Sequence, residues 1–272
     1  MITEPSPLSA PIEHGSKTRM QYQHRVVLVT GAAGLTGAAI AAAYARDGGA
    51  VGLIDFDAPA AAALAQRLTS AGHAVHFAAA DVGRYADCDA AWRSVEAALG
   101  PIDTLVNDAR ISPKQGGQPA PVWQMAPAEW LRVVDVNLNS AFNLVRLLAP
   151  GVVERRFGRV VAMSSVAGKA TLDIVAAHYA TTKATLIGMT RHLAGELGPH
   201  GITVNALAPG RIDTPMVAGA PAAANAAVVG ATPLRRLGRP DEVAQACLFL
   251  SSKRADFITG QVIDVAGGWL MT

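Results

Sequence analysis

The sequence predicts an α/β fold: a single domain with a doubly wound parallel sheet and helices on both of its faces. Three observations support this prediction. Short runs of β-branched and other apolar residues alternate with longer helical segments along the chain. A glycine-rich turn joins the first of these runs to an alanine-rich helix. No internal repeat or second unit interrupts the alternation, and this is the pattern of parallel strands buried between two layers of helices.

The strands and helices are expected in the following order. Strands buried on both faces are short and rich in valine, leucine and isoleucine, and such runs occur at residues 26–29, 51–54, 75–79, 104–106, 159–163, 203–207 and 262–265. The helices are the longer segments between the strands, at residues 38–47, 59–71, 86–99, 127–148 and 241–250, with a further helix that carries Tyr179 and extends to residue 197.

Two stretches are expected to lie outside this regular pattern. Residues 1–25 are polar, contain several prolines and lack the apolar core of a secretory signal, so we expect a flexible tail before a domain at residues 26–272. Residues 215–232 are rich in alanine and glycine and are expected to form a mobile segment over the substrate site. A solvated linker is the alternative for this second stretch.

The composition excludes several classes of function. The chain has 272 residues, is 51% hydrophobic and carries a net charge of +2, with its lysines and arginines scattered, so we expect no nucleic-acid partner. No apolar run reaches membrane-spanning length, and the histidines show no metal-binding spacing. Cys88 and Cys247 lie far apart, as buried thiols of a reducing compartment do. We therefore expect a cytoplasmic protein with no metal and no membrane contact.

The glycine-rich turn, TGAAGLTG at residues 30–37, follows a predicted strand and opens a predicted helix. Gly31 would allow a tight turn, Gly34 a close approach of the backbone to a pyrophosphate, and Gly37 close packing of the helix on the strand. The N-terminus of the helix offers free N–H groups and a positive dipole end for phosphate. This context predicts a dinucleotide site, and a tight turn without a ligand is the alternative.

Asp55 ends the second predicted strand, where a carboxylate accepts hydrogen bonds from the hydroxyls of an adenosine ribose. The same negative charge repels a 2′-phosphate. Neighbouring Phe56 offers no cation, and the glycine-rich turn contains no arginine or lysine. These features favour NAD over NADP. Asp57 is a weaker candidate, and we expect it to cap a helix.

Further polar residues stand at the ends of predicted strands. Asp81, Asn107 and Ser165 all fall at carboxyl ends, and ligands of open parallel sheets bind at that edge. Each residue alone could be a turn or cap residue. Together with the glycine-rich turn and Asp55 they predict one binding site.

Tyr179 and Lys183 stand four residues apart on a predicted helix, so their side chains project from the same face. An ammonium beside a phenol favours the phenolate, so the pKa of Tyr179 is expected to fall toward working pH. A phenol tuned in this way can exchange a proton with an alcohol or a ketone.

Together and in this order, these residues resemble the short-chain dehydrogenases/reductases, in the branch with a single compact domain. The resemblance covers about residues 26–271. It also rests on Asp81-Val82, Asn107-Asp108-Ala109, Val136-Asn137-Leu138, Ser164-Ser165-Val166-Ala167-Gly168, Pro209-Gly210 with Thr214, and Thr259-Gly260 through Gly267-Gly268. It implies a Rossmann-type fold, a nicotinamide cofactor whose own chemistry transfers hydride, and assembly as a homotetramer or homodimer.

The resemblance implies a catalytic set of four residues. Tyr179 would act as the general acid/base, and Lys183 would hold the nicotinamide ribose and lower the pKa of Tyr179. Ser165 would hydrogen-bond the substrate oxygen and stabilise the charge that develops on it. Asn137 would hold a water that connects Lys183 to solvent.

The resemblance also implies the residues that contact the cofactor. Asp81 would meet the adenine, Asn107 the adenosine-side ribose, and Thr214 with the backbone near Ile212 the nicotinamide end. The full set is Gly31, Gly34, Leu35, Thr36, Gly37, Asp55, Phe56, Asp81, Val82, Asn107, Ala109, Tyr179, Lys183, Pro209, Gly210, Ile212 and Thr214.

The chain departs from the family pattern in several places. Gly34 comes one residue early, so Leu35 takes the usual position of the middle glycine. Arg110 stands where the family has a small residue near the cofactor, and it would either crowd the cofactor or turn outward toward an anionic substrate. The stretch from Ser165 to Tyr179 is one residue longer than is common, and the usual aspartate before Gly267 is missing.

We therefore expect an NAD-dependent oxidoreductase that interconverts a secondary alcohol and a ketone, with a sugar-derived, polyol or hydroxy-acid substrate favoured. One alternative is a 3-oxoacyl-type ketone reductase that uses NADPH. Another is a protein that binds the cofactor without turnover because of Arg110. A sugar-nucleotide epimerase or dehydratase, suggested by the position of Gly34, would need a further substrate domain.

The substrate pocket is expected between residues 111–121, 166–178 and 215–229. Lys169, Asp173 and His178 would add polar groups to it, and Arg110, Lys114 and Lys169 together would select a carboxylate or a phosphate. Each of these cations could equally be a solvated surface group. On the Tyr179 helix, Leu186, Met189 and Leu193 fit either the core or a subunit interface.

Overall fold

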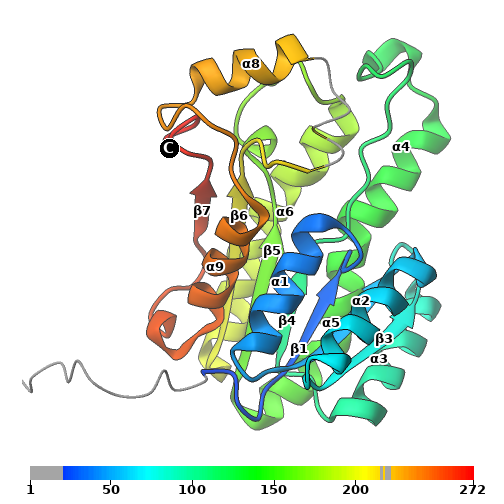
Figure 1. The fold of residues 1–272 in the computed structure, drawn as a ribbon, viewed down its shortest axis with the longest axis vertical. Helices are drawn as coiled ribbons and strands as arrows, with labels where there is room; N and C mark the ends of the chain where they lie inside the picture. The colour runs from blue at the N-terminus through cyan, green and yellow to red at the C-terminus, as the bar shows by residue number, and fades with distance from the viewer. Residues whose placement is uncertain (1–20, 215–216, 218–221) are drawn as a thin grey trace, which may run out of the picture.

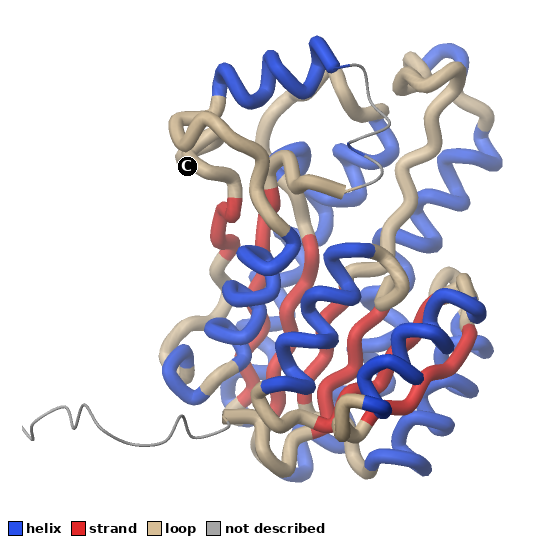
Figure 2. Tube along the Cα trace, in the orientation of Figure 1, coloured by secondary structure: helices blue, strands red, loops and turns tan. Residues whose placement is uncertain are grey.

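The computed structural model describes residues 21–214, 217 and 222–272, and its centre is a seven-stranded parallel sheet in the order β3-β2-β1-β4-β5-β6-β7 (Figures 1 and 2). The strands are β1 (Val26–Thr30), β2 (Ala50–Asp55), β3 (Val75–Ala79), β4 (Thr104–Asn107), β5 (Gly158–Met163), β6 (Ile202–Pro209) and β7 (Val262–Val265). The chain runs outward from β1 to β3 on one side and from β4 to β7 on the other. This confirms the doubly wound α/β fold.

Helices cover both faces of the sheet (Figure 1). On one face α1 (Leu35–Arg46), α2 (Ala58–Ser70) and α9 (Pro240–Ser251) bury apolar side chains such as Ile40, Leu64 and Val243 against the strands. On the other face α3 (Tyr85–Leu99), α5 (Ser140–Arg155) and α6 (Ala177–Leu197) bury Trp92, Leu144 and Leu197. Leu186 of α6 is also buried and belongs to the domain core.

Two further helices, α4 (Pro127–Val134) and α8 (Ala222–Ala231), extend past the strands at the end of the sheet where β7 terminates (Figure 1). Short 3₁₀ turns lie at Val122–Gln124, Val166–Gly168, Gly198–His200 and Lys253–Ala255. The helix α8 fills most of the stretch that we expected to be a mobile segment. Residues 215, 216 and 218–221 of that stretch lie outside the described residues.

The predicted helix at 127–148 is interrupted in the structure. The helix α4 passes through a π-helical stretch, Asp135–Asn139, into α5, which continues to Arg155 although Pro150 lies inside it. Tertiary packing explains why the helix outlasts the proline, because Leu148 and Val152 on either side of it are both buried. The helix ends at Arg156, which has a left-handed backbone. The π-helical stretch widens the turn that carries Asn137.

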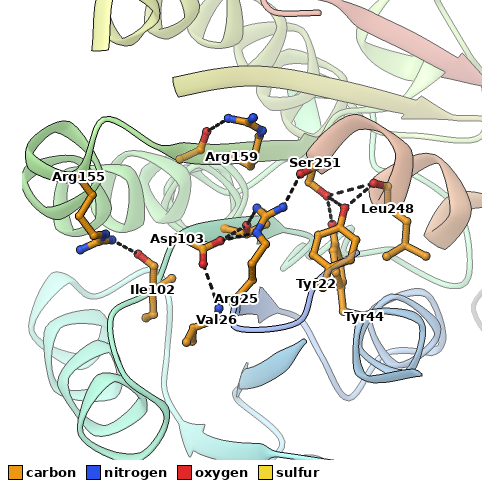
Figure 3. Close-up of polar contacts among 12 residues, drawn as sticks. Tyr22, Arg25, Val26, Tyr44, Ile102, Asp103, Arg155, Arg159, Leu248 and Ser251 are labelled. Atoms are coloured by element: carbon orange, nitrogen blue, oxygen red, sulfur yellow. Dashed lines mark hydrogen bonds and ion pairs between the residues drawn. The ribbon is translucent and has the colours of Figure 1, made fainter. Parts of the chain in front are cut away.

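The start of the domain is earlier than we predicted (Figure 3). We expected a flexible tail through residue 25, but Tyr22 is fully buried, packs edge-on against Tyr44 and hydrogen-bonds the Ser251 hydroxyl at 2.7 Å. Arg25 donates from Nε to Asp103 at 3.0 Å. The sequence prediction failed here because these polar side chains find partners that are distant in the sequence. Residues 1–20 of the expected tail lie outside the described residues.

Replacing Tyr22 by alanine is expected to lower the free energy of unfolding by about 3–5 kcal/mol, as other buried aromatic-to-alanine changes do. The loss combines a cavity beside Tyr44 with the missing hydrogen bond to Ser251. Urea denaturation measures it, with Tyr22→Phe as the control that removes only the hydroxyl and costs about 1 kcal/mol. Equal stability of the two variants would show that the ring does not contribute.

Within the described residues, none of the helices combines the length and apolarity that crossing a membrane requires. The same part of the chain brings together no group of three or more histidine, cysteine, aspartate or glutamate side chains suited to a metal ion.

Candidate active site

Two adjoining hollows lie at the carboxyl edge of the sheet. The glycine-turn hollow, of about 550 Å³, is lined by Gly31, Gly34, Asp55, Phe56, Asp81, Val82 and Ala109 among others. The tyrosine hollow, of about 120 Å³, is lined by Thr36, Ser165, Tyr179, Pro209, Gly210, Ile212 and Thr214 among others. Asp108 and Arg110 line both hollows. Most of the predicted site residues are therefore brought together, whereas Leu35, Gly37, Asn107, Asn137 and Lys183 line neither hollow.

The glycine-rich turn has the geometry that a pyrophosphate needs. Gly31 has a φ of 65°, and a Cβ there would lie 2.8 Å from the Cα of Ala109. A Cβ on Gly37 would lie 2.1 Å from the carbonyl oxygen of Gly31, so the close packing expected there requires glycine. The helix α1 begins at Leu35, three residues earlier than predicted, and no side chain caps its N-terminus. Its first N–H groups are thus available to an anion.

Asp55 is fixed at the wall of the glycine-turn hollow. Its Oδ2 accepts from the backbone N–H of Ala33 at 2.8 Å, and its Oδ1 accepts from the N–H of Asp57 at 2.9 Å. A carboxylate has further lone pairs, so Asp55 can still accept hydrogen bonds from a ligand's hydroxyls. Asp57 caps α2 by accepting from Ala60 at 3.1 Å, as expected.

Asp81 and Asn107, the other two residues predicted at strand ends on this side, differ in whether they line the glycine-turn hollow. Asp81 lines the hollow while its carboxylate pairs with Arg132 at 2.8 Å. Asn107 does not reach the hollow, because its Oδ1 accepts from the Thr30 hydroxyl at 2.8 Å and so joins the ends of β1 and β4. The expected ribose contact of the Asn107 side chain is not supported by this arrangement.

The catalytic candidates come from three elements. Ser165 follows β5, and its Oγ accepts from the N–H of Ala167 at 3.2 Å. Tyr179 and Lys183 lie one turn apart on α6, with the Lys183 Nζ 5.6 Å from the centre of the Tyr179 ring. That Nζ donates to the carbonyl oxygen of Met163 at 2.6 Å.

Asn137 lies in the π-helical stretch and binds the backbone of Ile111 from both ends of its amide. Its Oδ1 accepts from the Ile111 N–H at 2.8 Å, and its Nδ2 donates to the Ile111 carbonyl at 2.9 Å. Asn137 therefore fixes the backbone immediately after Arg110. The water-holding role that we expected for it stays a prediction.

Arg110 turns into the site and lines both hollows, so it does not take the outward arrangement that was one of the two we expected. Its guanidinium pairs with Asp108 at 2.9 Å, and the side chains of Arg110 and Asp108 are 25% and 1% exposed. The guanidinium also interacts with the Tyr179 hydroxyl. Asp108 was quoted in the family motif but given no role. Opposite charges two residues apart at a strand end were the signal in the sequence that could have revealed the pair.

The electrostatics of Tyr179 differ from the prediction. Burial raises the pKa of Tyr179, and the Arg110 guanidinium is the strongest influence that lowers it, followed by the Ser165 side chain. Burial, assisted by Arg110, lowers the pKa of Lys183 to about 7. Near neutral pH, Lys183 is therefore a partly neutral amine, while Arg110 stays charged. The cation that favours the phenolate in this structure is Arg110.

Three polar residues that we expected in the substrate pocket lie outside the tyrosine hollow. Lys169 pairs with Asp264 at 2.7 Å. His178 is fully buried against Glu129 at 3.1 Å. Asp173 does not line the tyrosine hollow either. Lys169 and Asp173 instead line a separate hollow, together with Pro119, Val122 and Thr171 among others, so the expected role of Lys169 in selecting an anion stays a prediction.

The tyrosine hollow holds a cation and an aromatic side chain that sequence reasoning missed. The cation is Arg211, which directly follows the Pro209-Gly210 pair and lines the hollow together with Arg110 and Lys114. Trp269, near the end of the chain, also lines the hollow. The position of Arg211 beside the predicted cofactor residues was a signal for it, whereas the apolar sequence around Trp269 indicated burial but not where.

Comparison with known proteins agrees with this geometry. Residues 31–270 match the family model described as enoyl-(acyl carrier protein) reductase. A solved structure, a 3-oxoacyl-[acyl-carrier protein] reductase from Brucella melitensis with bound NAD, is 45% identical with a TM-score of 0.88, over 100% of this chain and 98% of that one.

Two curated relatives are similar over almost their whole length. An acetoacetyl-CoA reductase of Allochromatium vinosum is 35% identical over 91% of this chain and 99% of its own. A 2-dehydro-3-deoxy-L-rhamnonate dehydrogenase (NAD(+)) of a Sphingomonas species is 35% identical over 91% and 96%. The chain belongs to the short-chain dehydrogenase/reductase family, and it is an NAD(P)-dependent oxidoreductase that acts on CH–OH groups.

Proposed function

We propose that this enzyme interconverts 3-hydroxyacyl and 3-oxoacyl compounds by hydride transfer and uses NAD as its cofactor. The observation that carries the proposal is that the two hollows adjoin at Asp108 and Arg110, which line both. A ligand that spans them has one end at Asp55 and the other at Tyr179. The family description and the reductases from Brucella and Allochromatium support a 3-oxoacyl substrate better than the sugar-derived or polyol substrate that we favoured from the sequence.

A sugar-derived acid is the second candidate substrate, because one relative is an NAD(+)-dependent dehydrogenase of such a compound. Both candidate classes share a secondary alcohol that is oxidised to a ketone. They differ in what lies beyond it: an acyl chain in one class and a row of hydroxyl groups in the other. The apolar side chains of Val166, Leu172, Val175 and Val217 in the tyrosine hollow favour the acyl chain.

The residues of the tyrosine hollow would carry the proton chemistry. The nicotinamide ring, when bound, supplies or accepts the hydride at the reacting carbon. In reduction Tyr179 would give its hydroxyl proton to the ketone oxygen, and in oxidation its phenolate would take the alcohol proton. Ser165 would hydrogen-bond the same oxygen. Arg110 would stabilise the phenolate, and Asn137 would hold Arg110 in place through Ile111.

The test of the proposal is a spectrophotometric assay of NADH oxidation with acetoacetyl-CoA, run beside a 2-dehydro-3-deoxy sugar acid. We expect turnover of acetoacetyl-CoA with NADH and slower turnover with NADPH. Turnover of the sugar acid alone would favour the second candidate. Tight NADH binding without turnover of any ketone would favour the cofactor-binding protein without activity.

Asp55 is expected to exclude the 2′-phosphate of NADPH. Fluorescence titration should show tighter binding of NADH than of NADPH by about tenfold or more, since an uncompensated charge at a binding site costs several kcal/mol. Asp55→Ser should reduce the difference, and Asp89→Ser is the control, because Asp89 pairs with Arg93 on α3 and lines neither hollow. Equal affinity of the unchanged enzyme for both cofactors would overturn the proposed role of Asp55.

Assembly as a homotetramer or homodimer, and a cytoplasmic location, stay predictions. Phe142 on α5 is 54% exposed, and the outer positions of α6 include the small residues Ala184 and Gly188, which would allow close approach of a second helix. Light scattering on the purified protein measures the assembly directly.

A further inference from the structure

Arg211 is an unusual cation in this structure. It lies two residues after the end of β6 and lines the tyrosine hollow together with Ser165 and Tyr179. Its guanidinium binds a neutral partner, donating from Nε at 3.1 Å and from Nη2 at 2.7 Å to the Oδ1 of Asn225 on α8. Asn225 in turn donates from Nδ2 to the carbonyl oxygen of Val217 at 2.9 Å. Within the described residues, the Nη1 of Arg211 makes no hydrogen bond.

The other buried or half-buried cations of the described chain have carboxylate partners. Leaving aside Lys183 of the catalytic set, these pairs are Arg25–Asp103, Arg110–Asp108, Arg159–Asp256 and Lys169–Asp264. Arg211 is the exception, because no carboxylate of the described residues lies within ion-pair distance of it. Burial accordingly lowers the pKa of Arg211, and no acid opposes the effect.

Withdrawing a cation from water is unfavourable unless an opposite charge or hydrogen bonds compensate it. Asn225 compensates part of this cost with one amide oxygen. A guanidinium that keeps a free Nη1 beside a reaction site is suited to binding a planar oxyanion. The anion that completes this site would come from the ligand.

We propose that Arg211 binds an anionic group at the end of the substrate that lies away from the reacting carbonyl. The inference rests on the proposed function for the identity of the reacting group, and it adds that the substrate is an anion. A carboxylate or a phosphate has the required chemistry. The carboxylate would belong to a free short-chain 3-oxo acid, and the phosphate to the carrier arm of a thioester.

The test compares three ketones that share the same reacting carbonyl: acetoacetate, acetoacetyl-CoA and the neutral methyl acetoacetate. Arg211→Gln should lower kcat/KM for the anionic substrate by about 10- to 100-fold through KM, the range expected for a hydrogen bond to a charged group. The same substitution should leave kcat/KM for methyl acetoacetate nearly unchanged. If kcat/KM falls for acetoacetate alone, the anion that Arg211 binds is a carboxylate. If it falls for acetoacetyl-CoA alone, the anion is the phosphate of the carrier arm.

Two further variants separate anion binding from support of α8. Asn225→Ala removes the contact to α8 but keeps the guanidinium, so the preference for the anion should persist. Arg67→Gln removes an exposed arginine of α2, and it should leave kcat/KM unchanged for all three substrates. An equal loss of activity on the neutral ester and the anions in Arg211→Gln would overturn the proposal, since it would show that Arg211 serves only to hold α8.

Failure of the proposed function can be distinguished from failure of this inference. If the unchanged enzyme reduces none of the three ketones, the 3-oxoacyl function is wrong. Calorimetric titrations of acetoacetate and, separately, of coenzyme A into the NAD-saturated enzyme then test the carboxylate and the phosphate without turnover. Binding that weakens at least about tenfold in Arg211→Gln supports the site. Binding that is equal in both proteins, or absent from the unchanged enzyme, overturns it.

Discussion

Replacing Tyr179 by phenylalanine is expected to reduce turnover by about 10²- to 10⁴-fold, the usual contribution of a positioned general acid or base. The change removes one oxygen atom and keeps the ring in the wall of the tyrosine hollow, so the fold should be unaffected. The affinity for NADH should change little, because Asp55 and the glycine-rich turn lie in the adjoining hollow.

The measurement combines steady-state kinetics with NADH fluorescence titration. Tyr85→Phe is the matched control, since Tyr85 is an exposed tyrosine at the start of α3 and the same atom is removed. Activity of Tyr179→Phe within about tenfold of the unchanged enzyme would contradict a general acid/base role. That result would favour the alternative in which the protein binds the cofactor and Tyr179 takes no part in proton transfer.

Replacing Arg110 by glutamine is expected to shift the pH dependence of alcohol oxidation to higher pH. The guanidinium is the strongest influence that lowers the pKa of Tyr179 against the effect of burial, so its removal raises that pKa further. Oxidation needs the phenolate, which forms as the pH rises through the pKa of Tyr179. At pH 7–8 a smaller fraction of Tyr179 is then ionised, and oxidation slows. Reduction needs the protonated phenol, so it is retained to higher pH.

Two neighbours respond to the same substitution. The Arg110 charge lowers the pKa of Lys183, so that pKa rises from about 7 in the variant, and Lys183 stays protonated over a wider range. This partly compensates for the missing guanidinium. Asp108 loses its ion-pair partner while it is only 1% exposed, and its pKa, already raised by burial, rises further. The double variant Asp108→Asn/Arg110→Gln removes the unpaired carboxylate, whose charge itself raises the pKa of Tyr179, so its profile should be shifted less than that of Arg110→Gln.

The readout is the pH profile of kcat/KM, together with the phenolate absorbance of each protein measured against its own Tyr179→Phe derivative. Arg110→Lys keeps a cation and should shift the profile less than Arg110→Gln. An unchanged profile in Arg110→Gln would assign control of Tyr179 to Lys183, as the sequence alone predicted. Activity that appears only in Arg110→Gly would instead support the reading in which Arg110 silences the enzyme.

The sequence by itself determined the architecture and most of the site. Parallel strands buried on both faces require continuous apolar runs, and these runs marked all the strands to within a few residues. Gly37 is required by a backbone contact within a single strand–turn–helix unit, so local sequence was enough to find it. Gly31 has a positive φ that the tight turn already indicates, and Ala109 after β4 also approaches it closely. Asp55 and Ser165 were found because ligands bind where parallel strands end, and Tyr179 was found from its four-residue spacing to Lys183.

The tertiary structure decided the properties that depend on neighbours distant in the chain. Tyr22 belongs to the core because Ser251, at the end of α9, meets its hydroxyl. Lys183 follows Tyr179 by one helical turn, yet burial removes much of its charge near neutral pH, and Arg110 from the end of β4 takes its electrostatic place. A pKa depends on the depth of burial and on every charge nearby. Neither quantity can be obtained from the spacing of two residues along a helix.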